Sequence, residues 1–501
     1  WPYPLADTLA AGRGLCDERL AAILCEAGPA AIRQMDGWRA GGARHADGRI
    51  RAAIAPGHDR PRCVYVDFLS TGPAVSRTLR GQVQRQPAIH RIGDLCITDL
   101  VVKDGIAAGA VGFSVTDGRP VSIAAKAVII ATGGLTRLYR RNSASANMGG
   151  DGYALALRAG AELIDMEFVQ FFPIGHLAPR LIGMDPIMWD PFRYKLGGRL
   201  LNAEGREFAD DYGTAEDGSY KITRDRATYA ILKEVEAGRG SPAGGAYLSF
   251  QHVPEAKLRA AFGPVIDRLA ANGIDLTRMP VEVAPIAHYH MGGIRVTPLF
   301  ETGIAQLFAA GEAVGGANGA NRLSGNAITE ALVFGRRAGA LAAERAAKTP
   351  TAAWDEAAAA PALALVAAGA PGPTPNPAAL IVALQALMAE RVGPFRTEAG
   401  LAAALAEIAE MRGTLGAAPP GAPGSFDLAR LDWFDARNML LVAEAVARAA
   451  LNRNESRGAH QREDHPLLVD DWAVNQTIRL EGERLALARV SVGAGAAAAA
   501  Q

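Results

Sequence analysis

Two glycine-rich turns are placed where the backbone can hold an anion or a flat cofactor. The first ends an apolar run that reads Ile129-Ile-Ala-Thr-Gly-Gly134. The second ends another, Leu307-Phe-Ala-Ala-Gly-Glu312, and is followed by a Gly/Asn-rich loop at 315–326 and a helical pattern. Glycine allows close approach of backbone N–H groups, and a helix N-terminus attracts negative charge. The two segments predict a cofactor site, although a plain tight turn explains the first one equally well.

The composition limits the classes of protein to consider. The chain has 501 residues, of which 49% are hydrophobic and 21% charged, and this balance is typical of a globular protein. Its 52 basic residues equal its 52 acidic residues, which argues against a nucleic-acid-binding protein. No apolar run approaches the roughly 18 residues of a membrane span. The four cysteines, Cys16, Cys25, Cys63 and Cys96, form no close pair, so we expect no metal site and a reducing, cytoplasmic location.

The elements that must position these turns follow from residue periodicity. We expect helices at 4–11, 16–38, 76–86 and 153–161, and strands at 63–69, 95–102, 107–115, 121–132 and 304–310. Lys103-Asp104-Gly105 predicts a hairpin turn. The apolar run 127–131 is typical of a strand buried on both faces of a layered sheet. Helices within 380–412 and at 428–450 predict a small antiparallel bundle, and 476–480 with 485–492 a hairpin.

Several ordered motifs resemble the flavoprotein subunit of the succinate dehydrogenase/fumarate reductase family, which also includes L-aspartate oxidase. They lie at 131–134, 149–161, 165–171, 288–294, 310–312, 319–326 and 455–464. The resemblance implies an α/β fold, with a layered, Rossmann-like FAD-binding domain, an inserted α+β capping domain and a C-terminal helical bundle. It also implies a small carboxylic-acid substrate. Because the chain has no cluster ligands of its own, electron transfer to a quinone would need an iron–sulfur partner subunit, which would also bring it to a membrane.

The resemblance also implies domain boundaries and cofactor contacts. We expect FAD-binding segments at 1–172 and 287–348, a cap at 173–286, a linker at 349–378, a helical domain at 379–455 and a C-terminal domain at 456–501. The family's strand and G-x-G-x-x-G turn for the FAD pyrophosphate is absent, since Gly12-Arg-Gly-Leu-Cys-Asp17 lacks the third glycine, and we expect that unit to precede this sequence. The implied cofactor contacts are Ala131, Thr132, Gly133, Gly134, Asp151, Gly311, Glu312, Asn326 and Ile328.

The implied catalytic residues lie in the capping segment. Lys221-Ile-Thr-Arg-Asp225 resembles the segment whose arginine moves a proton to or from the substrate carbon, which assigns that role to Arg224, with Arg226 as a competitor. Asp190 and Arg193 keep the acid and the arginine of the family's proton relay. A guanidinium with a pKa above roughly 12 is a poor acid in water, so this role requires a desolvated site.

The implied substrate contacts differ on the two sides of the site. His288 and Arg322 match the pair that binds one substrate carboxylate, although a core histidine and a loop salt bridge are the plainer interpretations. In Gln170-Phe-Phe-Pro173, Phe172 replaces the histidine that binds the other carboxylate, and Trp189 aligns with a threonine. An apolar wall does not compensate for the desolvation of a carboxylate. The replacements predict a partly apolar substrate, unless His176 takes the place of the lost histidine.

Three functions are compatible with this pattern. The first is an FAD-dependent oxidoreductase that interconverts a saturated carboxylic acid and its α,β-unsaturated form. The second is an amino-acid oxidase similar to L-aspartate oxidase, which Glu330 would fit. The third is a scaffold subunit that keeps the fold without the activity.

Overall fold

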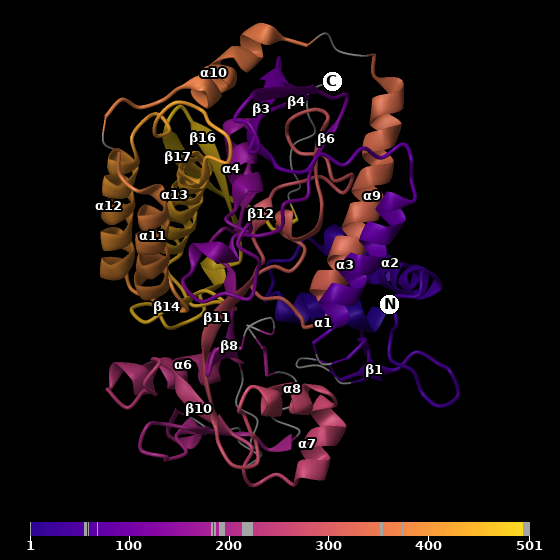
Figure 1. The fold of residues 1–501 in the computed structure, drawn as a ribbon, viewed down its shortest axis with the longest axis vertical. Helices are drawn as coiled ribbons and strands as arrows, with labels where there is room; N and C mark the ends of the chain where they lie inside the picture. Colours follow the sequence, from indigo (N-terminus) through magenta and orange to yellow (C-terminus); the bar gives the residue numbers. More distant parts are fainter. Residues whose placement is uncertain are drawn as a thin grey trace.

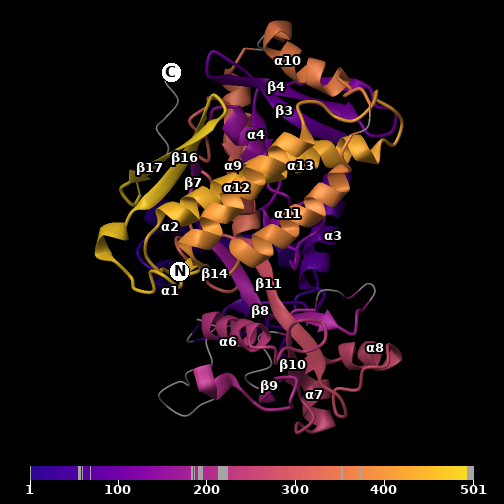
Figure 2. The same cartoon turned by 90° about the vertical axis from the view of Figure 1, so that its left-hand side faces the viewer.

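The computed structural model places a capping region beneath a larger body that contains the glycine turns and a helical bundle (Figures 1 and 2). It describes residues 2–54, 58, 60–67, 69–181, 184, 187–189, 196–212, 224–350, 354–372 and 374–493, with the backbone alone at 224–225. The helices are α1 (Pro2–Ala11), α2 (Glu18–Gly37), α3 (Thr71–Gln84), α4 (Asp151–Arg158), α6 (Arg224–Glu236), α7 (Glu255–Phe262), α8 (Val265–Ala271), α9 (Asn326–Lys348), α10 (Glu356–Ala367), α11 (Pro377–Arg391), α12 (Glu398–Leu415) and α13 (Leu428–Asn452).

A three-stranded antiparallel sheet, β3 (Leu95–Lys103), β4 (Ile106–Ser114) and β5 (Pro120–Ala124), forms the upper edge of the larger body. The predicted hairpin joins β3 to β4, and Asp104 (φ 50°) and Gly105 (φ 75°) both take the left-handed conformation that such turns require. The single strand predicted at 121–132 is wrong, because the chain leaves this sheet after β5 and enters another one.

That second sheet aligns the two glycine turns. Strands β6 (Val128–Ile130) and β13 (Leu307–Ala309) pair in parallel, so their carboxyl ends meet at one edge. Burial of β6 on both faces was expected and is wrong for Ile129, which is 38% exposed. Among the described residues β6 pairs only with β13, so it is an edge strand of a two-stranded sheet and not an interior strand of a layered one.

The capping region has its own sheet and core. The strand order is β8 (Val169–Ala178), β11 (Val281–His290), β10 (Ala246–Ser249) and β9 (Arg199–Leu201), with α6, α7 and α8 around it. Its buried cluster extends from Phe172 to Ile286 and is separate from the main core. The long antiparallel pair β8–β11 runs from the larger body into the cap (Figure 2). Its register shifts between Ala284 and Ile286 and again between Ala287 and Tyr289.

The C-terminal segments pack against the larger body. The bundle of α11, α12 and α13 is confirmed as predicted, and α13 contributes many residues to the main core. The predicted linker 349–378 contains α10. The predicted hairpin is also confirmed as β16 (Asn475–Glu481) and β17 (Arg484–Val490), which extend a sheet with β7 (Leu163–Ile164) and β12 (Gly293–Ile294). The remaining short strands pair as β1 (Ala52–Ala53) with β2 (Cys63–Val64) and β14 (Phe395–Arg396) with β15 (Gln461–Arg462). Among the described helices, none has the length and hydropathy to cross a bilayer.

Candidate active site

Close backbone packing brings the two glycine turns and the start of α4 together. A Cβ on Gly134 would lie 2.3 Å from Oε1 of Glu312, in the other turn. A Cβ on Gly152 would lie 2.2 Å from Oγ1 of Thr132. Gly133 has φ 75°, where a side chain is strained. A side chain at Gly134 or Gly152 would therefore displace Glu312 or Thr132, so the small residues let the two turns and the start of α4 lie close together.

Two carboxylates of this cluster are half-buried. Oε1 of Glu312 accepts a hydrogen bond of 3.0 Å from the backbone N–H of His290, and burial raises the pKa of Glu312 to about 7. Asp151 accepts a hydrogen bond of 2.8 Å from Nδ2 of Asn438, and burial raises its pKa as well. Glu312 thus carries a proton for part of the time near neutral pH, and it can either accept or donate a hydrogen bond to a polar ligand.

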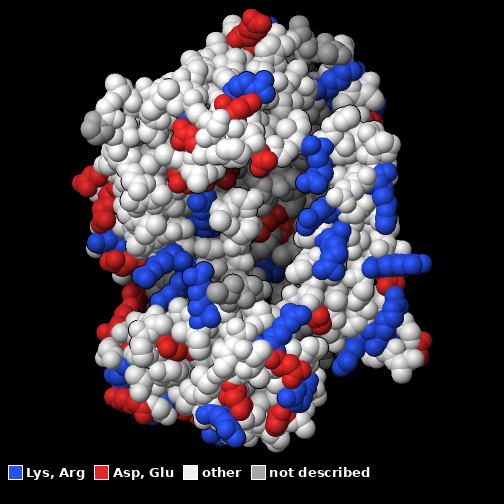
Figure 3. Space-filling model, in the orientation of Figure 1, with Lys and Arg blue, Asp and Glu red and all other residues white. Residues whose placement is uncertain are grey.

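The surroundings of the turns fit a flat cofactor such as FAD. Ala131 and Thr132 are exposed at the end of β6, while Glu312 and Ile328 are half-buried. Figure 3 shows a hollow near the centre of this face, between α9 and the rest of the larger body, with acidic side chains inside it. Asn326 begins α9, but its Nδ2 already donates to Oγ1 of Thr8 (3.1 Å) and Oδ1 of Asn318 (3.3 Å). A cofactor here would therefore meet the backbone of the first turn, Glu312 and the N-terminus of α9.

Arg322 is a buried arginine whose guanidinium is oriented by contacts within the protein. It is 6% exposed, and its Nη2 donates to Oε1 of Gln170 at 3.0 Å. Its guanidinium carbon lies 4.4 Å from the centre of the Tyr289 ring. Nε2 of Gln170 in turn donates to Oδ1 of Asn321 (2.7 Å) and to the carbonyl of Arg322 (3.0 Å). These contacts orient the guanidinium fork, which is the geometry that carboxylate recognition needs.

His288 precedes Tyr289 on β11. Its Nδ1 is 2.8 Å from Oγ of Ser143, and its ring centre is 5.9 Å from that of Phe172. Phe172 and His288 are therefore neighbours, while Arg322 contacts Tyr289, the residue that follows His288 on β11. Sequence reasoning missed Ser143 and Tyr289 as contacts, because Ser143 lies in a loop without a recognisable motif. Gln170 lies inside the motif 165–171, but the motif alone did not indicate its contact with Arg322.

Trp189 and His176 lie farther into the cap. Trp189 is completely buried, and its ring centre lies within 6 Å of those of Phe250 (5.9 Å), Phe262 (5.7 Å) and His176 (5.9 Å). Nε2 of His176 is 2.5 Å from the carbonyl oxygen of Pro179. In the β8–β11 pair, His176 of β8 lies opposite Val283 of β11, and Phe172 of β8 lies opposite Ile286. The structure places Phe172 beside His288. It places Trp189 in the core of the cap, and it keeps His176 farther along β8, opposite Val283.

The predicted catalytic residues are only partly described. Asp190 and Arg193 lie outside the described residues. Arg224 is the first residue of α6, and Arg226 is exposed one half-turn later. Their catalytic roles remain predictions.

A buried carboxylic acid supports Tyr289 from behind. Glu330 is completely buried, and its Oε2 accepts hydrogen bonds from the Tyr289 hydroxyl and from Nδ2 of Asn318 (3.0 Å). Burial raises the pKa of Glu330 to about 8, so the group is mostly protonated at neutral pH. The ring that carries the Arg322 guanidinium on its face is therefore fixed at its hydroxyl end.

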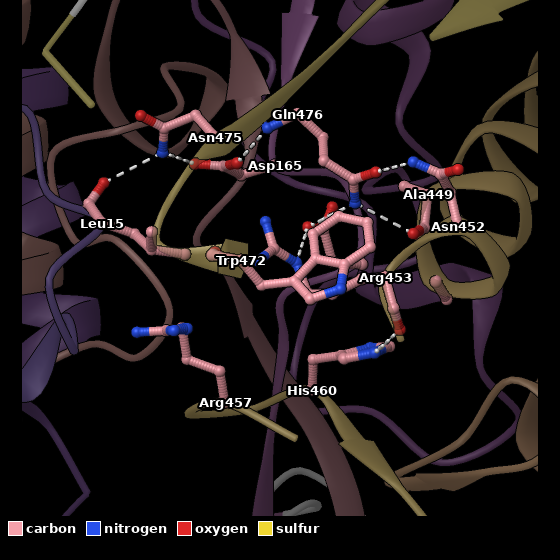
Figure 4. A network of polar contacts seen from close by, with 12 residues as sticks. Leu15, Asp165, Ala449, Asn452, Arg453, Arg457, His460, Trp472, Asn475 and Gln476 are labelled. Carbon is pink, nitrogen blue, oxygen red and sulfur yellow. Dashed lines mark hydrogen bonds and ion pairs between the residues drawn. The ribbon is translucent and has the colours of Figure 1, made fainter. Parts of the chain in front are cut away.

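A second buried polar network anchors the start of β8 (Figure 4). Arg453 pairs with Glu167 through Nε (2.6 Å) and with Glu455 through Nη1 (3.0 Å), and all three side chains are inaccessible to solvent. Asp165 accepts hydrogen bonds from Nδ2 of Asn475 (2.6 Å) and the backbone N–H of Gln476 (3.0 Å). Burial and the charge of Glu167 raise the pKa of Asp165 to about 7. The motif 455–464 therefore has a structural function, since it fixes the strand that carries Gln170 and Phe172.

Comparison with known proteins agrees with this geometry. The family described as "FAD binding domain" matches residues 1–328, and "Fumarate reductase flavoprotein C-term" matches 382–492. The chain is 35% identical to a subunit of the fumarate reductase (CoM/CoB) of Methanothermobacter marburgensis over 470 residues, which cover 93% of this chain and 84% of the relative. It is 31% identical to the L-aspartate oxidase of Streptomyces coelicolor over 508 residues, covering 96% and 82%.

A solved structure shows the same fold. Sdh1 of Mycobacterium smegmatis in complex with UQ1 superposes with a TM-score of 0.86 at 35% identity, covering 98% of this chain and 84% of that one. The sequence matches, the superposition and the paired glycine turns agree on an FAD-dependent oxidoreductase. The chain belongs to the succinate dehydrogenase/fumarate reductase flavoprotein family.

Proposed function

We propose that this flavoprotein interconverts a carboxylic acid that has a single carboxylate and its α,β-unsaturated form. The proposal depends on one observation above the others, the Phe172 ring 5.9 Å from the ring of His288. Arg322 and His288 supply donors for one carboxylate, whereas a phenyl ring supplies none for a second. Placing an unpaired carboxylate against that ring would cost on the order of several kcal/mol. An alkyl or aryl group in the same place would gain about 0.8 kcal/mol per buried methylene.

The roles of the residues follow from where each charge develops. Bound FAD supplies the two-electron chemistry, in which the saturated acid loses a hydride from one carbon and a proton from the next. The Arg322 fork, oriented by Gln170, binds the carboxylate and stabilises negative charge that develops on it. His288, fixed by Ser143, binds the same carboxylate. In this proposal Arg224 at the start of α6 exchanges the proton, with Asp190 and Arg193 as the relay.

The test is a comparison of substrates. Fumarate and a β-substituted acrylate, such as a 3-aryl or 3-alkyl acrylate, are reduced by the purified holoenzyme with a chemical electron donor. We expect kcat/KM to favour the substituted acrylate by tenfold or more, which corresponds to about 1.4 kcal/mol. A tenfold preference for fumarate would overturn the proposal and would leave a dicarboxylate enzyme.

An L-aspartate-oxidase-like activity is the second candidate, because L-aspartate oxidases of several organisms are 31–33% identical to this chain. It predicts oxidation of an amino acid to an imino acid, with release of ammonia on hydrolysis. Ammonia release from L-aspartate, measured beside the acrylate assay, separates the two candidates. Turnover of L-aspartate with no turnover of any acrylate would support this second candidate.

We also propose a protein partner for electron transfer. Sdh1 of Mycobacterium smegmatis was solved in complex with UQ1, and another relative is a quinol-fumarate reductase solved with menaquinol molecules. The described cysteines of this chain are all free and form no cluster-binding set. An iron–sulfur subunit would supply the missing path to a quinone, and the cytoplasm is the compartment that fits the free thiols. Co-purification from the source cells tests this proposal.

A further inference from the structure

Helix α6 presents one side to the helical bundle, across the boundary between the cap and the larger body (Figures 1 and 2). Tyr229, Leu232 and Lys233 are spaced three and four residues apart, which places them on one face of the helix. Each of them meets a different structure on the far side of the boundary. This face therefore contains the α6 residues that meet the bundle and the C-terminal segment in the contacts described below.

Two of these residues form specific contacts. Nζ of Lys233 lies 2.7 Å from Oε1 of Glu463, and the two side chains are 26% and 39% exposed. The ring of Tyr229 meets the ring of Phe395 edge to face, with centres 4.9 Å apart. Both partners lie on or directly after the short strands β14 and β15, in the bundle and the C-terminal segment.

The receiving side of this contact is rigid. The backbone N–H of Glu463 donates to the carbonyl of Arg396 at 2.9 Å. Nη1 of Arg396 is 2.8 Å from Nδ1 of His460 and 2.8 Å from the carbonyl oxygen of Glu167. Because Glu167 lies two residues before β8, the residues that receive α6 are bonded to the strand that carries Phe172.

The rest of the boundary is loosely filled. Beside Leu232 lies a cavity of about 300 Å³, whose other walls come from β8, β11, the 139–141 segment and α11. Its lining includes Phe171, Pro285, Ala386, Ala389 and Glu390. The two buried cores on either side are separate. Among the described residues, no single buried core spans the cap and the bundle, which is typical of a contact that opens and closes.

We propose that Lys233 and Tyr229, with Glu463 and Phe395, form a latch that holds α6 in its working position. The proposal rests on the proposed function in one respect, because α6 begins at Arg224, the predicted proton-exchanging residue. Lys233 and Tyr229 are positioning residues in this scheme, since they act through the placement of the helix. Opening the latch releases the cap, and closing it returns the first residue of α6 to the substrate.

The test compares Lys233→Met and Glu463→Gln with the charge exchange Lys233→Glu/Glu463→Lys. Hydrogen exchange of the α6 amides in the holoenzyme reports how often the helix opens. We expect each single variant to speed this exchange about two- to fivefold, the range for an ion pair that is partly exposed. kcat/KM should fall by a similar factor, and the charge exchange, made together with Glu236→Gln so that the new carboxylate meets no like charge, should restore both quantities. Because salt screens the pair, the difference from wild type should shrink at 1 M NaCl.

Two variants serve as matched controls. Glu236→Gln removes the other partner of Lys233, within the same helix, and leaves the latch in place. Lys257→Met removes an exposed cation from α7 of the cap. Both should behave like wild type. The latch is refuted if Lys233→Met exchanges no faster than these controls, or if the charge exchange does not restore protection.

Hydrogen exchange needs no substrate, so the two proposals fail separately. Faster exchange in Lys233→Met together with a strong preference for fumarate would keep the latch and refute the substrate proposal. Unchanged exchange together with a preference for substituted acrylates would refute the latch and support the substrate proposal.

Discussion

The two halves of the active site are built in different ways. In the cofactor half, backbone segments interlock so closely that a single methyl group on Gly134 or Gly152 would overlap a neighbouring side chain. In the cap half, rings pack around Trp189 in a separate core, and a two-strand connection and a few side chains tie this core to the rest. The difference supports the proposal that Arg322 is held in a fixed part of the site, while Arg224 arrives with the cap.

The largest expected effect tests the cap half. Arg224→Gln should lower kcat roughly 10⁴-fold, at the upper end for loss of a positioned proton-exchanging group, with the flavin content unchanged. Arg226→Gln, two residues along the same helix, is the matched control and should retain most of the activity. Steady-state rates and flavin absorbance measure both. If Arg226→Gln is the inactive variant, the proton role moves to Arg226.

The cofactor half should respond to Arg322→Lys, which keeps the charge and removes the fork. We expect kcat/KM to fall about 10²–10³-fold, because the lysine cannot reproduce the bidentate donor geometry. Arg337→Lys, on the exposed side of α9, is the control. A loss of less than tenfold would mean that the guanidinium fork of Arg322 does not bind the carboxylate.

Phe172→His should replace an apolar wall of the site with a hydrogen-bond donor. The new imidazole adds a donor beside His288, so kcat/KM for fumarate relative to a substituted acrylate should rise about tenfold, or about 1.4 kcal/mol. Phe172→Leu keeps the wall apolar and should leave the ratio near that of wild type. Equal ratios in all three proteins would show that Phe172 does not determine the substrate.

The last prediction concerns the dependence of stability on pH and no change in turnover. Folding raises the pKa of Glu330 from its ordinary value of 4.5 to about 8, so between these values the unfolded chain releases a proton that the folded chain keeps. Wild-type stability therefore declines across this window, by at most about 1.4 kcal/mol per pH unit from this group. Glu330→Gln removes that decline, so its thermal midpoint should rise relative to wild type from pH 5 to pH 8. Glu344→Gln, exposed on the same helix, should show no such trend.

The same contrast explains what the sequence could predict. The turn at 131–134 and the loop that contains Arg322 are continuous motifs, so their residues could be named before the structure was known. The exposure of Ile129 and the division of 121–132 into β5 and β6 depend on how the strands are assembled into sheets. Local periodicity does not contain that information. Ser143 meets His288 from 145 residues away, and Lys233 meets Glu463 from 230 residues away, so neither contact leaves a local pattern. Trp189 could be noticed in the sequence as an aromatic residue, but its burial depends on the folding of Phe250 and Phe262 around it.

The irregular pairing of β8 and β11 has a thermodynamic consequence. His288 lies within the stretch of β11 where the register shifts, between the larger body and the cap. If the cap moves as proposed, the strand pair can bend at this stretch, and a carboxylate bound by His288, as proposed, would change the free energy of the bend. Linkage then requires reciprocity: the factor by which the cap position changes ligand affinity equals the factor by which the ligand changes the cap equilibrium. Measuring either quantity therefore yields the other.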